Sequence, residues 1–318
     1  MFKFKTPSQE TRKIMSKVAL GKLTDTDFEE MCIEKIKKLT NCKEVKITSS
    51  GNNSIFIALS SVKGDIIIPD QGGWHGFKQI GKFLNKNIIT LKTDSGLINP
   101  DHIEELDVEE GSALIYTSFA GYCAEQNTKS IAKFCKNNGI LTIEDASAGI
   151  GDLENKLAKY SDIILGSTGS PKIINAGSGG FIAYNIPEVF KETPIPQKLS
   201  KASEIICSGI CSELDNVGEK LELTLNATKY LKKHINNSLH QDKRGVNVII
   251  PHDDAKSISW NLKKSLTTDK RGFITTCPNY NRVKQKAVSI EVKNLDYSCL
   301  EKEHLDKIIE EIEISNLQ

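Results

Sequence analysis

Lys172 is the residue in this sequence best placed for covalent chemistry. It ends the segment GSTGSPK, which follows a strand-like run, and the glycine-rich turn NAGSGG comes soon after it. A lysine that forms an imine needs a lowered pKa and room for its reaction partner, and small neighbours leave that room. Most lysines are only solvated, so this segment alone makes Lys172 a candidate.

A carboxylate at the end of another strand could complement that lysine. Asp145 follows the apolar run LTI within the segment IEDASAG, and an acid that emerges among small residues can pair with a cationic ring nitrogen. Two other interpretations stay open. Asp145 could cap a helix, or Gly149 and Gly151 could belong to a nucleotide-binding turn, although the GxGxxG spacing is missing.

The turn SSGNNS at residues 49–54 could bind an anion. It lies between a predicted strand and a predicted helix. Glycine lets a backbone approach a ligand closely, and the unpaired N–H groups at the start of a helix favour phosphate. Many strand–helix turns have this composition and bind nothing, so the turn gains weight only from its neighbours.

Short apolar runs alternate with helical segments through the first 185 residues, which indicates βαβ units and a mainly parallel sheet. We expect strands near 45–48, 65–68, 87–91, 112–117, 140–144, 162–165 and 180–184. We expect helices near 8–20, 26–39, 52–61, 74–84, 100–106 and 126–137. The predicted fold class is α/β with a seven-stranded, mainly parallel sheet. Open parallel sheets bind ligands at the carboxyl ends of their strands, where all three candidate segments fall.

The rest of the chain follows a different pattern. Three prolines between residues 187 and 196 break the alternation. We expect helices near 198–213, 214–237 and 300–314, and strands near 246–250, 272–276 and 286–292. The chain is therefore divided into an N-terminal helical segment (1–45), a large domain (46–190) and a C-terminal part (191–318) made of linker helices and a small α/β domain.

The composition is that of an ordinary globular protein. Of 318 residues, 38% are hydrophobic and 26% are charged, and the net charge of +1 gives no sign of nucleic acid as a partner. The apolar runs are too short to span a membrane, and the segment MFKFKTPSQETRK has no apolar signal region. We therefore expect a cytoplasmic protein.

Eight cysteines are present without a CxxC motif, and reduced, buried thiols are the expectation. Cys207 and Cys211 are four residues apart, so a helix would place them on one face. A metal or redox role for this pair is the weaker interpretation, because a lone CxxxC lacks partner ligands. The six histidines form no HxxxH motif, so no metal site is predicted.

Four segments occur in an order that resembles the DegT-like sugar aminotransferases and their fold-type-I relatives. They read SSGNNSIFIAL, GDIIIPDQGGWHGF, FCKNNGILTIEDASAGIGD and GSTGSPKIINAGSGGFIAYN. The resemblance covers roughly residues 30–185 and is looser beyond them. It implies the aspartate-aminotransferase type of fold and pyridoxal 5'-phosphate (PLP) as the cofactor.

The resemblance assigns roles around the reactive part of the cofactor. Lys172 is the expected Schiff-base lysine, and Asp145 is expected to bond the protonated pyridine nitrogen, which keeps the ring an electron sink. Ser147 or Ala148 is expected near the other edge of the ring.

The resemblance also assigns the remaining cofactor contacts. Gly51 and Asn52 are expected to donate backbone N–H groups to the phosphate, and Ser167 to add its hydroxyl. Trp74 is expected to stack on the pyridine ring. Its register relative to the family aromatic is shifted by two glycines, so His75 is the alternative, and a buried core tryptophan is another.

Two features set this chain apart from the family pattern. The chain is short for the family, and the late strand has VKQKAV where an arginine commonly binds a substrate carboxylate. Only Arg271 and Arg282 lie nearby, and surface placement is the expectation for each. Lysine does not copy the bidentate geometry of a guanidinium, so the substrate stays open.

The sequence-based hypothesis is a PLP-dependent aminotransferase that acts on a small-molecule amino donor and acceptor, as a homodimer. A PLP-dependent lyase or desulfurase is the first alternative, with Cys277 in the segment TTCPN as its candidate thiol. The second is a non-catalytic binding protein with this fold. A nucleotide-binding α/β protein would need a phosphate loop that the sequence does not contain.

Overall fold

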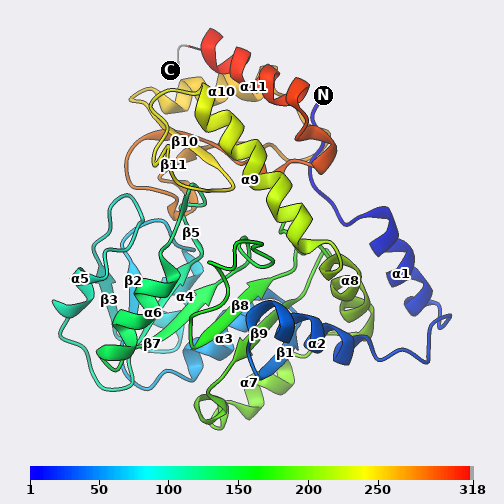
Figure 1. The fold of residues 1–318 in the computed structure, drawn as a ribbon, viewed down its shortest axis with the longest axis vertical. Coiled ribbons are helices and arrows are strands. Elements are labelled where there is room, and N and C mark those ends of the chain that lie inside the picture. The colour runs from blue at the N-terminus through cyan, green and yellow to red at the C-terminus, as the bar shows by residue number, and fades with distance from the viewer. Residues whose placement is uncertain (316–318) are drawn as a thin grey trace.

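The computed structural model describes residues 1–315 and is built around one seven-stranded sheet (Figure 1). Its strand order is β1-β9-β8-β7-β4-β2-β3. The strands are β1 (Glu44–Thr48), β2 (Ile66–Pro69), β3 (Ile88–Leu91), β4 (Ala113–Thr117), β7 (Leu141–Asp145), β8 (Ile163–Ser167) and β9 (Gly180–Tyr184). All seven predicted strands are present. Only β9 pairs antiparallel with its two neighbours, so the other six strands end at the same edge.

The central strands are apolar on both faces because helices cover the sheet on both sides. Every residue of β2, β4 and β9 is buried. On one face α3 (Gly51–Ser60) and α4 (Gly76–Phe83) pack against the strands. The opposite face is covered by α5 (Asp101–Glu104), α6 (Thr128–Asn137), α2 (Phe28–Thr40) and α8 (Glu204–Leu214). The helix α1 (Gln9–Ala19) packs on α8.

Polar side chains cap the helices and set their starts. Ser50 begins α3, and its side chain accepts a hydrogen bond from the N–H of Asn53 at 3.1 Å. Ser203 caps α8 in the same way. The prediction of one helix over 198–213 is therefore wrong: α7 (Pro194–Leu199) ends before this cap, and α8 begins after it. A further turn, η1 (Pro187–Phe190), lies where the prolines break the predicted alternation of strands and helices.

The C-terminal part forms a smaller α/β lobe around a three-stranded antiparallel sheet, β10-β12-β11. Its elements are α9 (Val217–His234), β10 (Val248–Pro251), α10 (Ala255–Ser265), β11 (Ile274–Cys277), η2 (Asn279–Asn281), β12 (Ala287–Ile290), η3 (Val292–Asn294), η4 (Tyr297–Cys299) and α11 (Lys302–Ile314). The long α9 runs from the large sheet to this lobe (Figure 1). The predicted α/β fold class is confirmed, whereas α10 and the short ribbon β5 (Phe119–Ala120) with β6 (Ala124–Glu125) were not predicted.

No helix among residues 1–315 is long and apolar enough to cross a membrane.

Candidate active site

The carboxyl edge of the large sheet holds a cavity of about 200 Å³. The turn after β1, the last residues of β7 and β8, and the loop after β8 converge there. The residues that line it are Ser50, Gly51, Asn52, Ile55, Trp74, Tyr122, Asp145, Ser147, Leu165, Ser167 and Lys172. The structure thus brings together all seven residues proposed for the site, although they are spread over more than a hundred positions of the chain.

The first turn of α3 forms one end of the cavity. Its leading N–H groups have no partner within the helix and carry the positive end of the helix dipole. A Cβ on Gly51 would lie 2.4 Å from the Cβ of Ser167, so only glycine allows this close approach. The hydroxyl of Ser167 stands on the adjacent strand end. Together these groups have the chemistry that suits an anion.

A buried carboxylate stands across the cavity. Oδ1 of Asp145 accepts hydrogen bonds from the backbone N–H of Ser147 at 3.0 Å and from its hydroxyl at 2.5 Å. Burial raises the pKa of Asp145 above its ordinary value, and the Lys172 ammonium and the two Ser147 bonds oppose that rise. A cation that reaches this carboxylate would relieve the cost of its burial.

The Lys172 side chain enters from the loop after β8. Its backbone N–H bonds the carbonyl of Gly169 at 2.9 Å, which closes a tight turn. Among the described residues, no carboxylate lies within ion-pair distance of its Nζ. That nitrogen lies 5.7 Å from the ring centroid of Tyr122. The amine is therefore held in the cavity without a fixed acidic partner.

Two aromatic residues contribute walls to the cavity. Trp74 lines it, whereas His75 lines a neighbouring cavity and packs against the indole with ring centroids 4.0 Å apart. Tyr122 was not predicted from the sequence. It follows β4 in a turn with φ of +65°, and its position after a predicted strand end is the only sequence signal that could have found it.

These residues fit pyridoxal phosphate. The cofactor combines a phosphate, a planar ring with a basic nitrogen, and an aldehyde. The cavity offers an anion site, aromatic walls, a buried carboxylate that lacks a cationic partner, and a primary amine. Each chemical group of the cofactor therefore has a complementary side chain or helix end in one cavity.

The model of the DegT/DnrJ/EryC1/StrS aminotransferase family matches residues 9–202, more than half of the chain. The chain belongs to this family. Residues 218–313 match a second family model, the C-terminal domain of the MJ1341 family. The family assignment confirms the resemblance found in the four ordered segments.

The chain is also similar to a curated relative in sequence and to solved structures in fold. A serine hydroxymethyltransferase from Orientia tsutsugamushi is 26% identical over 180 residues, which are 52% of this chain and 42% of that protein. The chain therefore spans less than half the length of this curated relative. An aminotransferase of pseudoaminic acid biosynthesis from Helicobacter pylori has a TM-score of 0.77 and 14% identity, covering 99% of this chain and 98% of its own.

A second solved structure with a similar fold is that of a protein from the same family. It is a DegT DnrJ EryC1 StrS aminotransferase from Brucella abortus, with a TM-score of 0.74 and 14% identity. The match covers 95% of this chain and 94% of that one. Both structures show that the fold extends over nearly the whole chain, including the C-terminal lobe.

The expectation that Arg282 lies on the surface is wrong for this DegT-family chain. Arg282 is only 7% exposed, and its Nε and Nη2 donate to the carboxylate of Glu291 at 2.9 and 3.1 Å. Lys293 also pairs with Glu291. The guanidinium stacks on Tyr122, 4.4 Å from its ring centroid. Arg282 therefore supports a wall of the cavity and does not line the cavity itself, whereas Arg271 is exposed.

None of the eight cysteines lines the cavity. Cys277 lies in the C-terminal lobe, where burial raises the pKa of its thiol to about 12. A thiol with so high a pKa stays protonated near neutral pH, so it is a poor nucleophile. The structure gives the desulfurase alternative no thiol at the site.

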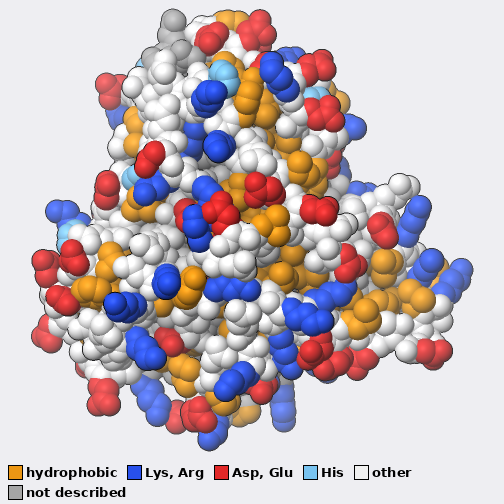
Figure 2. Space-filling model, in the orientation of Figure 1, with side chains coloured by type: hydrophobic (Ala, Val, Ile, Leu, Met, Phe, Trp, Pro, Cys, Tyr) orange, Lys and Arg blue, Asp and Glu red, His pale blue; other side chains and the backbone are white. Residues whose placement is uncertain are grey.

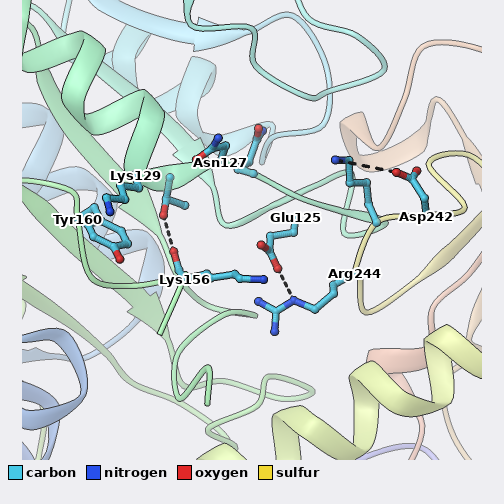
Figure 3. A pocket seen from close by; sticks show the side chains of 10 residues that line it. Glu125, Asn127, Lys129, Lys156, Tyr160, Asp242 and Arg244 are labelled. Atoms are coloured by element: carbon cyan, nitrogen blue, oxygen red, sulfur yellow. Dashed lines mark hydrogen bonds and ion pairs between the residues drawn. The ribbon is translucent and has the colours of Figure 1, made fainter. Parts of the chain in front are cut away.

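A larger cavity of about 440 Å³ lies between the start of α6 and the loop that holds Arg244 (Figure 3). Arg244 pairs with Glu125, and it bonds Asp152 at 2.9 and 3.2 Å and Glu154 at 2.9 Å. The guanidinium is thus fully engaged by carboxylates. This cavity has no nucleophile with an adjacent base, so the smaller cavity at the sheet edge is the candidate active site.

Proposed function

We propose that the chain catalyses PLP-dependent transfer of an amino group between small molecules. The observation that carries this proposal is the placement of Lys172, Asp145 and the start of α3 around one cavity. The family assignment supports transamination, but the motif set and the fold are common to several reactions of this cofactor.

The residues act by binding and by proton transfer. The start of α3 with Ser167 binds the phosphate, and Trp74 packs on the ring. Asp145 holds a proton on the ring nitrogen. Bound in this way, PLP withdraws electrons from the amino-bearing carbon of the substrate. Lys172 would hold the cofactor through its amine and would move the proton at the substrate Cα as a general base.

The experiment is a panel of amino donors, amino acids and amino sugars, added singly to the PLP-loaded protein. Transfer leaves the amino group on the cofactor, so the visible absorbance band should disappear when no acceptor is present. A keto acid should restore it. Release of a product with the band unchanged would instead indicate a lyase. No response to any donor would favour a non-catalytic role.

Cleavage of a substrate carbon–carbon bond is the second candidate. It rests on the sequence similarity to serine hydroxymethyltransferase. The same panel distinguishes the two, because cleavage of serine would yield glycine and a one-carbon fragment without loss of the visible band.

We also propose a homodimer whose interface lies beside the cavity. Ile195 and Leu199 of α7 are 68% and 80% exposed. The carbonyl of Ser200, which ends this helix, accepts from the N–H of Ser49 at 2.7 Å, next to the cavity. Exposed apolar side chains at this place are typical of an interface. Leu199→Glu should produce monomers in light scattering, whereas Leu20→Glu, at the 65% exposed residue that follows α1, should not.

A cytoplasmic location is proposed on the state of the thiols. All eight cysteines are free and buried, which suits a reducing compartment. Basic and acidic side chains are interspersed over the face in Figure 2, which supports a small-molecule substrate over a nucleic acid. Localisation of a tagged chain by cell fractionation tests this proposal.

A further inference from the structure

Three thiols meet where α2 packs on α8, away from the cavity. Cys32 of α2 donates its S–H to the carbonyl of Cys207 at 3.0 Å, and its side chain lies beside that of Cys211. Cys207 and Cys211 share one face of α8, as the four-residue spacing predicts. All three residues belong to the same buried cluster. Cys32 and Cys211 are therefore thiols in contact from two different helices.

A cation sits beside one member of the pair. Nζ of Lys35 donates to the carbonyl of Cys211 at 3.1 Å and pairs with Asp215. The neighbouring Cys32 and then the charge of Lys35 hold the pKa of Cys211 below its ordinary value, against the effect of burial. Cys211 is thus the nucleophilic member, and Cys32 is its protonated neighbour.

The neighbouring groups explain why Cys211, and not Cys207, would react. Burial raises the pKa of Cys207 to about 12, so that thiol stays protonated. The Lys35–Asp215 pair lies beside Cys211, and its side chains are 28% and 59% exposed. Pairs of this kind add little stability, so this pair can open without a large cost. A cavity of about 560 Å³ on the other side has Cys207 in its wall.

We propose that Cys32 and Cys211 are a reversible oxidation site that forms a disulfide with a peroxide as the oxidant. The Cys211 thiolate attacks one peroxide oxygen, the O–O bond breaks, hydroxide leaves, and a sulfenic acid remains on Cys211. Cys32 gives up its proton as its sulfur attacks the sulfur of Cys211, and water leaves as the S–S bond forms. Sulfur supplies two electrons and the peroxide is reduced. A small thiol reverses the step by exchange.

The position of the pair connects it to the cofactor-binding turn. On α8, Ile206 and Ile210 lie against Gly179, where an added Cβ would approach their side chains at 2.8 and 3.0 Å. Gly179 belongs to the turn between Lys172 and β9. The disulfide would therefore tie α2 to the helix that supports this turn, although the proposal itself concerns only the two thiols.

The test treats the PLP-loaded protein with hydrogen peroxide, alkylates the free thiols and maps the peptides by mass spectrometry. We expect loss of two of the eight free thiols, a Cys32–Cys211 cross-linked peptide, and recovery of both thiols with dithiothreitol. Cys32→Ser and Cys211→Ser should each abolish the cross-link, and Cys135→Ser in α6 should leave it intact. A different cross-linked pair, or oxidation of Cys211 without a cross-link, would overturn the proposal.

A second measurement does not need the serine variants to fold. The rate of Cys211 alkylation in the native protein should rise with pH through a midpoint below that of an ordinary thiol, because the pKa of Cys211 is lowered. Lys35→Met should move that midpoint upward and slow alkylation at neutral pH by roughly tenfold or more. Lys38→Met, on an exposed position of the same helix, should not. A Cys211 that alkylates no faster than Cys207 in the native protein would equally count against the site.

Discussion

Two buried clusters of charged side chains meet at Tyr122 and differ in how their charges are balanced. In the C-terminal lobe, Arg282 and Lys293 enclose the carboxylate of Glu291. At the edge of the large sheet, Asp145 and Lys172 line one cavity without an ion pair between them. Only the second cluster leaves groups for a ligand. A buried charged group therefore marks a candidate ligand site when no residue of the protein pairs with it.

Arg282, Lys293 and Glu291 form a closed cluster, in which the charges of the members balance one another. Burial acts to raise the pKa of Glu291, but Lys293 and Arg282 outweigh it and hold that pKa well below its usual range. Burial lowers the pKa of Lys293 to about 7. The Glu291 carboxylate thus balances the permanent charge of Arg282. This cluster packs against the ring of Tyr122, and it needs no ligand.

Asp145 and Lys172 form the open cluster. The largest effect is expected there, from Lys172→Ala. Without the amine, the cofactor has no covalent attachment and the substrate Cα has no base, so turnover should fall to background. Borohydride reduction followed by peptide mapping should label Lys172 in the native chain and nothing in the variant. Lys133→Ala, at an exposed position of α6, is the control. Labelling of another lysine in the native chain would refute the assignment.

Asp145→Asn should have the next largest effect. An amide keeps the shape and still accepts from Ser147, but it cannot stabilise a proton on the ring nitrogen. We expect bound cofactor and a fall in turnover of about two to three orders of magnitude. Absorbance of the bound cofactor and steady-state kinetics measure the two separately. Near-normal turnover would mean that Asp145 does not face the ring nitrogen.

The open cluster could be predicted from the sequence because its members come from strand ends. Gly51, Asp145, Ser167 and Lys172 each follow a recognisable strand or belong to its last residues, and parallel strands bring such positions to one edge. No long-range pairing had to be known beyond the order of the elements. The seven strands were predictable for a similar reason, because strands covered on both faces are continuous apolar runs.

The closed cluster could not be predicted in this way. Arg282 lies in a loop with no periodic pattern, and its partner Glu291 follows β12, an antiparallel strand of the same lobe. Burial of a charge depends on contacts that no local spacing encodes, so an exposed arginine was the reasonable expectation. Tyr122 was missed because its role depends on both clusters at once.

Glu291→Gln tests whether the closed cluster is structural. Removing the carboxylate leaves Arg282 buried without its charge partner, which should lower the free energy of unfolding by about 3–5 kcal/mol. Chemical denaturation measures this change. Glu192→Gln, which alters an exposed pair with Lys63, should leave the midpoint unchanged. An equally small effect at Glu291 would mean that the cluster does not hold the lobe together.

Glu144 offers the smallest but most direct test of the comparison, because it neighbours Asp145 on β7 and points to the opposite face of the sheet. As in the closed cluster, the partners of this side chain come from the protein itself. The Glu144 carboxyl accepts hydrogen bonds from Ser118 at 2.7 Å, Ala158 at 2.9 Å and Ser161 at 3.4 Å. Burial raises the pKa of Glu144 to about 7, against these hydrogen bonds. Between its ordinary pKa and about 7 the folded chain holds one proton more than the unfolded chain, so stability falls as pH rises through this window.

Glu144→Gln stays neutral and keeps an acceptor for Ser118 and Ala158. The variant should therefore lose less stability than the native chain between pH 5 and pH 7.5, by at most about 3 kcal/mol. Denaturation curves at the two pH values measure this difference, with Glu110→Gln on the surface as the control, and parallel losses in Glu144→Gln and the native chain would show that Glu144 does not hold a proton in the fold.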